Sequence, residues 1–214
     1  MRLTFKYPVY PTNTQEQTLL VWFDHLCDLQ DSARNNRKHA YETEGRFVTQ
    51  SEQQALLTVT RAKYDDFRAV PQDFQVSILK RVDKAFDNFR RRCKEGAEKK
   101  GYPRFKMRVR SLTWCLRKHK LKTGERVRQN PIIETDFRHN RLKVPKLGEI
   151  KIRMHRPLVG DPKEVTLVKK ASGWYANITC EIPETPKVEP KRCTQHTLKG
   201  GLRPSWRAVG YHPR

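Results

Sequence analysis

The 214-residue sequence has no apolar run that approaches the roughly 20 residues needed to span a bilayer. Its opening, MRLTFKYPVYP, lacks the apolar stretch of a secretory signal. These absences predict a cytoplasmic protein with no membrane partner. The five cysteines are odd in number and scattered, with no CxxC pair, which indicates reduced thiols rather than a disulfide framework.

Motifs of catalysis are also missing, since the chain has no Gly-x-Ser-x-Gly and no His-Glu-x-x-His. Gly96 and Gly101 have the spacing of a phosphate-binding loop, but Tyr102-Pro103 follows where Lys and Ser or Thr are needed. Asp161 is the last aspartate, and the four glutamates after it do not form the converging set that metal-dependent phosphodiester hydrolysis requires. We therefore predict no catalytic residues, no bound metal or other cofactor, and no enzymatic activity for this chain.

What the sequence has in excess is positive charge, with 45 Lys or Arg against 23 Asp or Glu and a formal net charge of +22. Residues 90–128 hold 16 of the basic residues and three acids, and so carry +13, whereas residues 1–89 have 12 of each sign. Such a segment repels itself unless a polyanion lies against it. Its interleaved aromatic residues suit stacking on bases. A nucleic acid is therefore the favoured partner, and the alternative is a solvated basic face.

The candidate nucleic-acid-binding residues are Arg90, Arg91, Arg92, Lys99, Lys100, Tyr102, Arg104, Phe105, Lys106, Arg108 and Arg110. We expect the cationic side chains in this set to contact phosphates. Tyr102 and Phe105 either stack on bases or pack within the protein.

The hydrophobic periodicity predicts an α+β fold. Residues 2–10 alternate between apolar and polar side chains, as in a half-buried strand. Three helices follow, with N-termini expected at Thr14-x-x-Gln17, at Ser51-x-x-Gln54 and at Pro71. After Gly101 the period changes to two, which predicts about five antiparallel strands.

An isolated strand ahead of three helices cannot form a stable sheet. We therefore expect residues 2–10 to pair with a strand from residues 142–182, so that the helices are an insertion into a β-barrel or sandwich. On the third helix, we expect Asp83 and Asp87 to flank an apolar stripe and to be solvated. The predicted parts are residues 1–12, the first strand of the barrel; 13–100, a helical lobe with a helix-turn-helix-like start; 101–183, the remainder of the barrel; and 184–214, a disordered tail.

Several short motifs follow one another between residues 1 and 183. They are Tyr10-Pro11-Thr12 with Gln15-x-Gln17, Leu79-x3-Asp83-Lys84-Ala85-Phe86-x-Asn88-Phe89, Gly101-Tyr102-Pro103-Arg104-Phe105-Lys106, Val144-Pro145-Lys146-Leu147-Gly148-x-Ile150-Lys151-Ile152, and His155-Arg156-Pro157-Leu158 with Gly173-Trp174-Tyr175. In this order they resemble the N-terminal half of the TnpB (OrfB) family of transposon-encoded RNA-guided endonucleases, which are also described as transposases.

The resemblance implies an antiparallel WED-type β-barrel split by an inserted three-helix recognition lobe. It also implies that the two parts clamp a guide RNA paired with target DNA, together with duplex DNA that carries a short adjacent motif. In the family a RuvC-like nuclease domain with catalytic acids, Mg²⁺ and a four-cysteine zinc ribbon follows, but here the resemblance stops near Pro183–Pro190.

We therefore expect a nucleic-acid-binding N-terminal fragment of a TnpB-like protein, without the nuclease domain, its Mg²⁺ or its zinc. A frameshift or premature end in a decaying transposon gene accounts for such a chain. Two alternatives stay open: a nuclease-free DNA-binding repressor-like module, and an RNA-binding structural protein. No oligomeric state follows from the sequence.

Overall fold

The computed structural model describes residues 1–105, 107–116, 118–120, 126–128, 131–133 and 140–182. The chain divides into two units, Met1–Pro183 and Glu184–Arg214. The second unit, for which we predicted disorder, lies outside the described residues, as does Lys106. The fold described below is that of the first unit.

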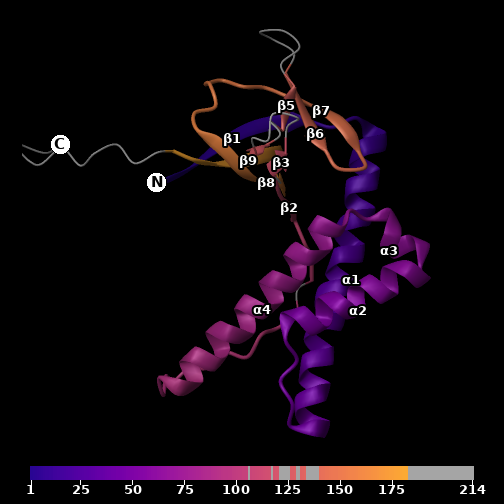
Figure 1. Ribbon diagram of the computed structural model, residues 1–214, viewed down its shortest axis with the longest axis vertical. Coiled ribbons are helices and arrows are strands. Elements are labelled where there is room, and N and C mark those ends of the chain that lie inside the picture. The colour runs from indigo at the N-terminus through magenta and orange to yellow at the C-terminus, as the bar shows by residue number, and fades with distance from the viewer. Residues whose placement is uncertain (106, 117, 121–125, 129–130, 134–139, 183–214) are drawn as a thin grey trace, which may run out of the picture. The chain divides into compact units, whose positions relative to one another are not determined.

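The first unit combines four helices with antiparallel strands, which confirms the α+β prediction (Figure 1). Seven strands form a curled half-barrel sheet in the order β2-β8-β9-β1-β7-β6-β5, and a separate hairpin pairs β3 with β4. The strands are β1 (Arg2–Tyr10), β2 (Ser111–Cys115), β3 (Lys118–Lys120), β4 (Arg126–Arg128), β5 (Ile132–Ile133), β6 (Arg141–Val144), β7 (Gly148–Ile152), β8 (Asp161–Lys170) and β9 (Gly173–Glu181). The expectation of about five strands after Gly101 was too low, because several of these strands are two to four residues long.

Strand β1 lies between β9 and β7, which confirms that residues 2–10 pair with the region 142–182. Its register with β9 runs from Arg2 opposite Glu181 to Val9 opposite Trp174. Every second side chain from Phe5 onward is buried, and the residues of β9 alternate in the same way. The alternation that predicted the strand thus also fixes the face that β1 turns to the core.

The helices fall between β1 and β2 in the sequence, and they are α1 (Asn13–Glu44), α2 (Gln50–Lys63), α3 (Asp65–Ala69) and α4 (Gln72–Lys94). The prediction of three helices missed α3, which has five residues and no buried side chain, and so gives no periodic signal. Two predicted helix starts were also displaced by two residues. Thr12, with Gln15, forms the capping box of α1, and Thr49 accepts the hydrogen bond from Glu52 at the start of α2.

Aromatic side chains join the helices to the sheet. Trp22 of α1 and Trp114 of β2 both pack against Phe74 of α4, with ring centroids 5.7 and 5.6 Å from that of Phe74. Phe23 stacks on Trp174 of β9 at 5.6 Å. The same hydrophobic core therefore includes residues of α1, α4 and the sheet.

Arg81 makes a polar link between α4 and β2. It donates from Nη2 to the hydroxyl of Thr113 at 2.8 Å and from Nη1 to the carbonyl of Ser111 at 3.3 Å. Burial lowers the pKa of the Arg81 guanidinium, and the nearby carboxylate of Glu164 partly opposes this effect. Arg81 is therefore part of the fold rather than of an exposed surface.

Between the helices the packing includes buried polar groups. Arg37 of α1 is 4% exposed, and its Nη1 lies 2.8 Å from Oδ1 of Asp83 on α4, while its Nε donates to Gln53 of α2 at 2.9 Å. The expectation that Asp83 is solvated was only partly right, because its side chain is 28% exposed but pairs with the buried guanidinium of Arg37. Asp87, one turn further, is exposed as expected and pairs with Arg90.

Candidate nucleic-acid interface

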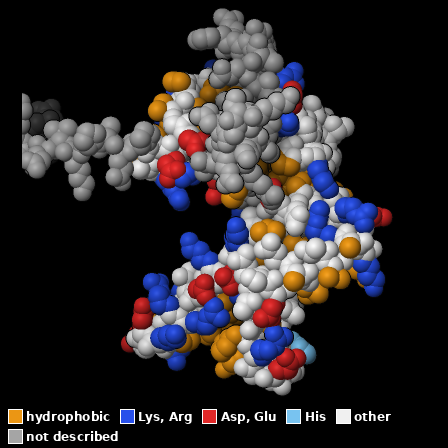
Figure 2. Space-filling view, viewed as in Figure 1, with side chains coloured by type: hydrophobic (Ala, Val, Ile, Leu, Met, Phe, Trp, Pro, Cys, Tyr) orange, Lys and Arg blue, Asp and Glu red, His pale blue; other side chains and the backbone are white. Residues whose placement is uncertain are grey.

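Lysines and arginines gather along α4 (Figure 2). The apolar stripe of this helix, from Phe74 to Phe86, faces the core, so its cationic side chains lie on its other faces and in its last turns. The three predicted arginines there have protein partners. Arg90 pairs with Asp87, and Nε of Arg91 lies 4.0 Å from Glu95.

Arg92 fixes the start of the segment that follows α4. Its Nε donates to the carbonyl of Lys100 at 2.6 Å, and its Nη2 donates to the carbonyl of Gly101 at 2.9 Å. Gly101 has φ +57°, a conformation that glycine adopts readily, and the Arg92 guanidinium lies 3.5 Å from the place where a Cβ would stand. Arg92 therefore positions residues 100–101, and both its Nε and its Nη2 already donate to backbone carbonyls.

The aromatic residues of this segment pack on the helices. Tyr102 meets Phe86 and Phe89 of α4 edge-on, with centroids 5.8 and 5.1 Å apart. Arg34 of α1 lies over the ring of Phe105 at 3.9 Å and donates from Nε to the carbonyl of Pro103 at 2.7 Å. Tyr102 thus packs on α4 but is still 39% exposed, and Phe105 is 54% exposed.

Three predicted cations next to these aromatic residues point into solvent. Lys99, Lys100 and Arg104 are exposed, and their side chains make no ion pair with any residue that the structure describes. They are available to phosphates. Lys106 lies outside the described residues.

The last two predicted cations, Arg108 and Arg110, line a pocket of about 450 Å³ between α1 and the turn that joins β8 to β9. Both are exposed, and Val109 between them is 5% exposed and belongs to the core. Both arginines belong to the lining of the same pocket. The pocket is lined by Leu20, Phe23, Asp24, Arg108, Val109, Arg110, Lys169, Lys170 and Ala171.

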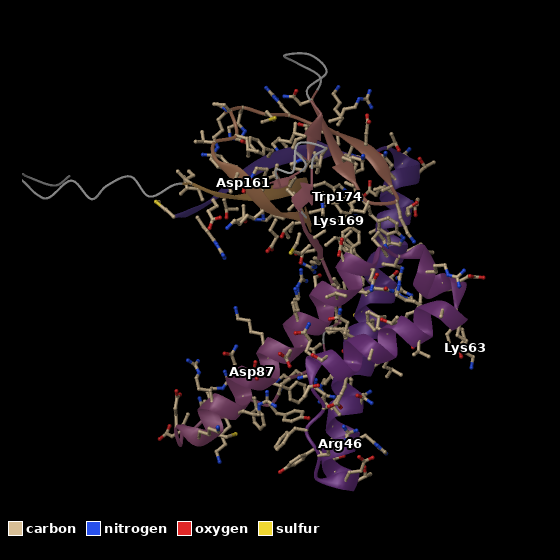
Figure 3. The ribbon with its side chains drawn as sticks, in the orientation of Figure 1. Arg46, Lys63, Asp87, Asp161, Lys169 and Trp174 are labelled. Carbon is tan, nitrogen blue, oxygen red and sulfur yellow. The ribbon has the colours of Figure 1, made fainter. Side chains whose placement is uncertain are left out.

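Two of the cations that line this pocket, Lys169 and Lys170, were not predicted as site residues. Glu16 of α1 accepts from Nζ of Lys169 at 2.9 Å and from Nε1 of Trp174 at 3.1 Å, and these hydrogen bonds lower the pKa of Glu16 (Figure 3 labels Lys169 and Trp174). Lys169 is thus largely neutralised, whereas Lys170 is exposed. The sequence signal for them is a lysine pair directly before the turn Ala171-Ser172-Gly173.

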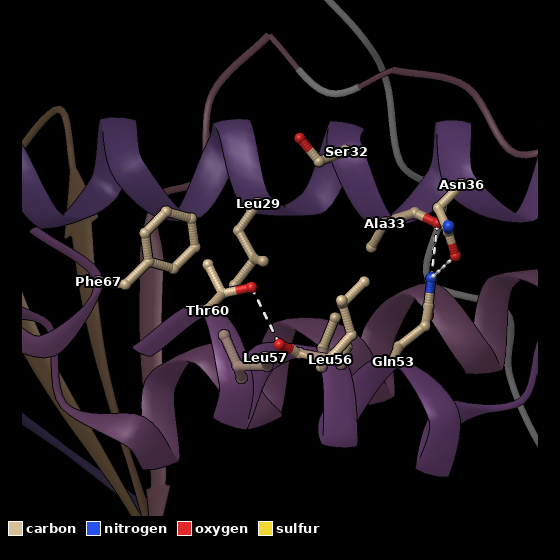
Figure 4. Close-up of a pocket in the computed structure, with 10 residues that line it drawn as sticks. Leu29, Ser32, Ala33, Asn36, Gln53, Leu56, Leu57, Thr60 and Phe67 are labelled. Carbon is tan, nitrogen blue, oxygen red and sulfur yellow. Dashed lines mark hydrogen bonds between the residues drawn. The ribbon is translucent and has the colours of Figure 1, made fainter. Parts of the chain in front are cut away.

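A second pocket lies among the helices and has a volume of about 140 Å³ (Figure 4). Its lining is mostly apolar and includes Leu29, Leu57 and Phe67. Gln53 donates at its edge to the carbonyl of Ala33 at 2.8 Å. Because no charged side chain lines it, this pocket does not suit a phosphate.

The described residues contain no group of three or more His, Cys, Asp or Glu side chains that could hold a metal ion. In the same part of the chain, every helix is too short or too polar to cross a membrane. Comparison of the sequence with protein-family models gives no match. Comparison with curated proteins gives none either.

Proposed function

We propose that the chain binds nucleic acid, with a guide RNA–DNA heteroduplex as its ligand and adjacent duplex DNA as a further contact. This is the N-terminal, non-catalytic role that the resemblance to TnpB-like proteins implies, with the sheet as the WED-type part and the helices as the recognition lobe. Because a heteroduplex is recognised through its shape and backbone, the protein's share of the binding is contact with phosphates.

The observation that carries the proposal is the pocket beside the β8–β9 turn. Arg108, Arg110 and Lys170 reach it from two separate segments, and among the described residues of its lining Asp24 is the one acidic side chain. Cations from distant segments that converge on one hollow increase the local potential, which attracts a polyanion. Lys99, Lys100 and Arg104 extend the exposed positive charge of the same segment away from the pocket.

The surface suits phosphates better than base edges. Its cations lie on an irregular segment and at a strand end, and none is on a helix that presents a row of side chains to a groove. Such contacts position a duplex and carry no sequence information. The guide therefore supplies the sequence specificity.

A charge-matched pair of variants tests the pocket. The triple variant Arg108→Ala/Arg110→Ala/Lys170→Ala removes the exposed cations of the pocket, and Lys63→Ala/Lys143→Ala/Lys151→Ala removes three exposed lysines from α2, β6 and β7. Each lowers the net charge from +22 to +19. Affinity for a labelled heteroduplex is measured by fluorescence anisotropy at about 150 mM salt.

The first variant is expected to bind roughly a hundredfold more weakly than the parent chain, because three phosphate contacts are lost. The control is expected to stay within about threefold of the parent chain. Equal losses in both would show that net charge and not the pocket determines binding. Preference for duplex DNA alone would favour the repressor-like alternative, and preference for RNA alone would favour the RNA-binding structural protein.

A further inference from the structure

Two exposed aromatic rings lie side by side where α1 ends. Tyr41, in the last turn of α1, is 54% exposed, and Phe47, in the loop that follows, is 60% exposed. Their ring centroids are 5.2 Å apart with an interplanar angle of 31°. The two rings therefore contact each other while more than half of each side chain remains exposed to solvent.

The loop that carries Phe47 is fixed in place. Gly45, with φ 63°, ends α1 and donates to the carbonyl of Tyr41 at 3.0 Å. Arg46 pairs with Glu44 at 3.2 Å and with Glu52 at 2.7 Å, and Val48 is 7% exposed (Figure 3 labels Arg46). The two rings are therefore held in a preformed orientation, which lowers the entropic cost of binding.

A cation of α4 completes the surface. The guanidinium carbon of Arg90 lies 5.8 Å from the centroid of Phe47, and Asp87 holds this side chain (Figure 3 labels Asp87). Hydrophobic side chains gather between the ends of α1 and α4, with cationic side chains beside them (Figure 2). Phe47 thus connects the basic end of α4 with Tyr41.

Four acids near the pair share three cationic partners. Glu44 and Glu52 pair with Arg46, Asp87 pairs with Arg90, and Glu42 lies 3.6 Å from Nζ of Lys38. Because Glu44 and Glu52 share Arg46, this cluster keeps one net negative charge, which disfavours a phosphate beside the rings. A planar, neutral group suits this place, whereas a bare phosphate does not.

We propose that Tyr41 and Phe47 form a stacking platform for unpaired nucleobases, with Arg90 beside it. This inference rests on the proposed function and adds a second kind of contact to it: the pocket takes phosphates, and the platform takes bases that are free of a duplex. Aromatic side chains bind single strands with little sequence preference, because every base has a π-face. A second copy of this chain is a poor occupant, since each copy carries +22.

The test uses the full chain and two probes of about 20 nucleotides, a single DNA strand containing 2-aminopurine and the blunt duplex of the same sequence. Tyr41→Leu and Phe47→Leu remove the rings but keep apolar side chains. Tyr64→Leu is the matched control, because Tyr64 is also 50% exposed and also has a cation, Nζ of Lys63, 5.4 Å from its ring centroid. Tyr41→Trp keeps an aromatic ring and tests rescue.

Tyr41→Leu and Phe47→Leu are each expected to bind the single strand about tenfold more weakly, with the quenching of 2-aminopurine reduced. The salt dependence is expected to stay that of the parent chain, because no charge is removed. Tyr64→Leu and Tyr41→Trp are expected to bind and quench as the parent chain does. Affinity for the blunt duplex is expected to be unchanged in all four variants.

Three results would overturn the platform and leave the proposed function standing. The first is salt-dependent binding of the single strand that Tyr41→Leu does not weaken. The second is a loss of affinity that is equal for the single strand and the blunt duplex. The third is a parent chain that sediments as a dimer and is dissociated by Tyr41→Leu. A parent chain that binds neither these probes nor the labelled heteroduplex at any salt concentration would overturn both the platform and the proposed function.

Discussion

The arginines that donate to acceptors within the fold and the arginines of residues 104–110 differ in what they contact. Arg37 is buried between Asp83 and Gln53, and Arg61 donates to the carbonyl of Val70 at 2.8 Å. The inner arginines, each with a side-chain or backbone acceptor, are Arg34, Arg37, Arg61, Arg81 and Arg92. The outer arginines, which are exposed and have no ion pair among the described residues, are Arg104, Arg108 and Arg110.

This difference shows that positive charge counted along the sequence overstates the surface that is available to a polyanion. A guanidinium has five donors, so it can bond several carbonyls where loops and helices meet. Arg92, which lies within the segment of highest charge, acts in this way by donating to the carbonyls of Lys100 and Gly101. The binding surface is made by the cations that remain exposed.

The largest effect on stability is expected from the inner group. Replacing Arg37 by Ala leaves Asp83 and Gln53 without the guanidinium. Breaking a buried pair costs about 3–5 kcal/mol, and the lower end of that range is expected because the Asp83 side chain is 28% exposed. Chemical denaturation of Arg37→Ala measures this loss of unfolding free energy. Nη2 of Arg37 is buried and has no hydrogen-bond partner among the described residues, so the pair is not fully satisfied even in the parent chain.

A double variant distinguishes the effect of the unpaired charge from the effect of lost packing. Arg37→Met/Asp83→Leu removes both charges and keeps the volume, so it is expected to recover most of the stability that Arg37→Ala loses. A double variant as unstable as Arg37→Ala would show that packing, and not the uncompensated charge, explains the loss.

A smaller effect is expected for Arg34, which contacts the segment 102–105 from α1. Arg34→Lys keeps the charge but loses the planar fork that donates to Pro103 and stacks on Phe105. The expected loss of unfolding free energy is about 1–2 kcal/mol. Trypsin is expected to cleave after Arg104 faster than in the parent chain, and an unchanged cleavage rate would contradict this role of Arg34.

The sequence predicted the sheet better than the helix ends. Alternation in residues 2–10 and in β9 is visible because each strand buries one face, and the need to pair β1 then determined its partner. Helix starts were displaced because Thr12 and Thr14 are both acceptable caps, and only the fold selects between them. Asp83 was misjudged for a similar reason, since its partner Arg37 is distant in sequence.

The sequence predicted which kinds of residue form the candidate site, but it did not predict how they are arranged in space. Charge density identified the segment 90–110, yet it could not distinguish Arg92, which bonds carbonyls, from Arg108, which is exposed. Lys170 was missed because its neighbours in the pocket come from another segment. Tyr41 and Phe47 carry no charge, and their exposure is decided by the helix packing.

A modest effect of pH on stability is expected from His25, because its protonation would add a cation close to Arg61. Burial lowers the pKa of His25 most, Arg61 lowers it further, and Asp28 and Asp66 oppose the shift. As the pH falls below about 6.5, His25 takes up a proton more readily in the unfolded chain than in the folded chain. The stability that is present above that pH is therefore lost as the pH falls through the lowered folded-state pKa of His25. The melting temperature is expected to fall less between about pH 7.5 and about pH 5.5 in His25→Phe than in the parent chain. An equal fall in both would exclude His25 as the cause.

The smallest effect on stability is expected from the outer group. Arg108→Ala/Arg110→Ala is expected to change the unfolding free energy by less than about 0.5 kcal/mol, because neither side chain has a described partner. Chemical denaturation under the conditions used for Arg37→Ala gives the comparison directly. A loss approaching that of Arg37→Ala would remove the distinction between inner and outer arginines.

The salt dependence of binding tests the central claim most directly. The affinity of the full chain for a guide RNA–DNA heteroduplex is measured by fluorescence anisotropy between about 50 and about 200 mM salt. If about six exposed cations neutralise phosphates, log K falls against log salt with a slope of about −5. The double variant Arg108→Ala/Arg110→Ala then gives a slope that is smaller in magnitude by about two. A slope near zero for the parent chain would contradict the account.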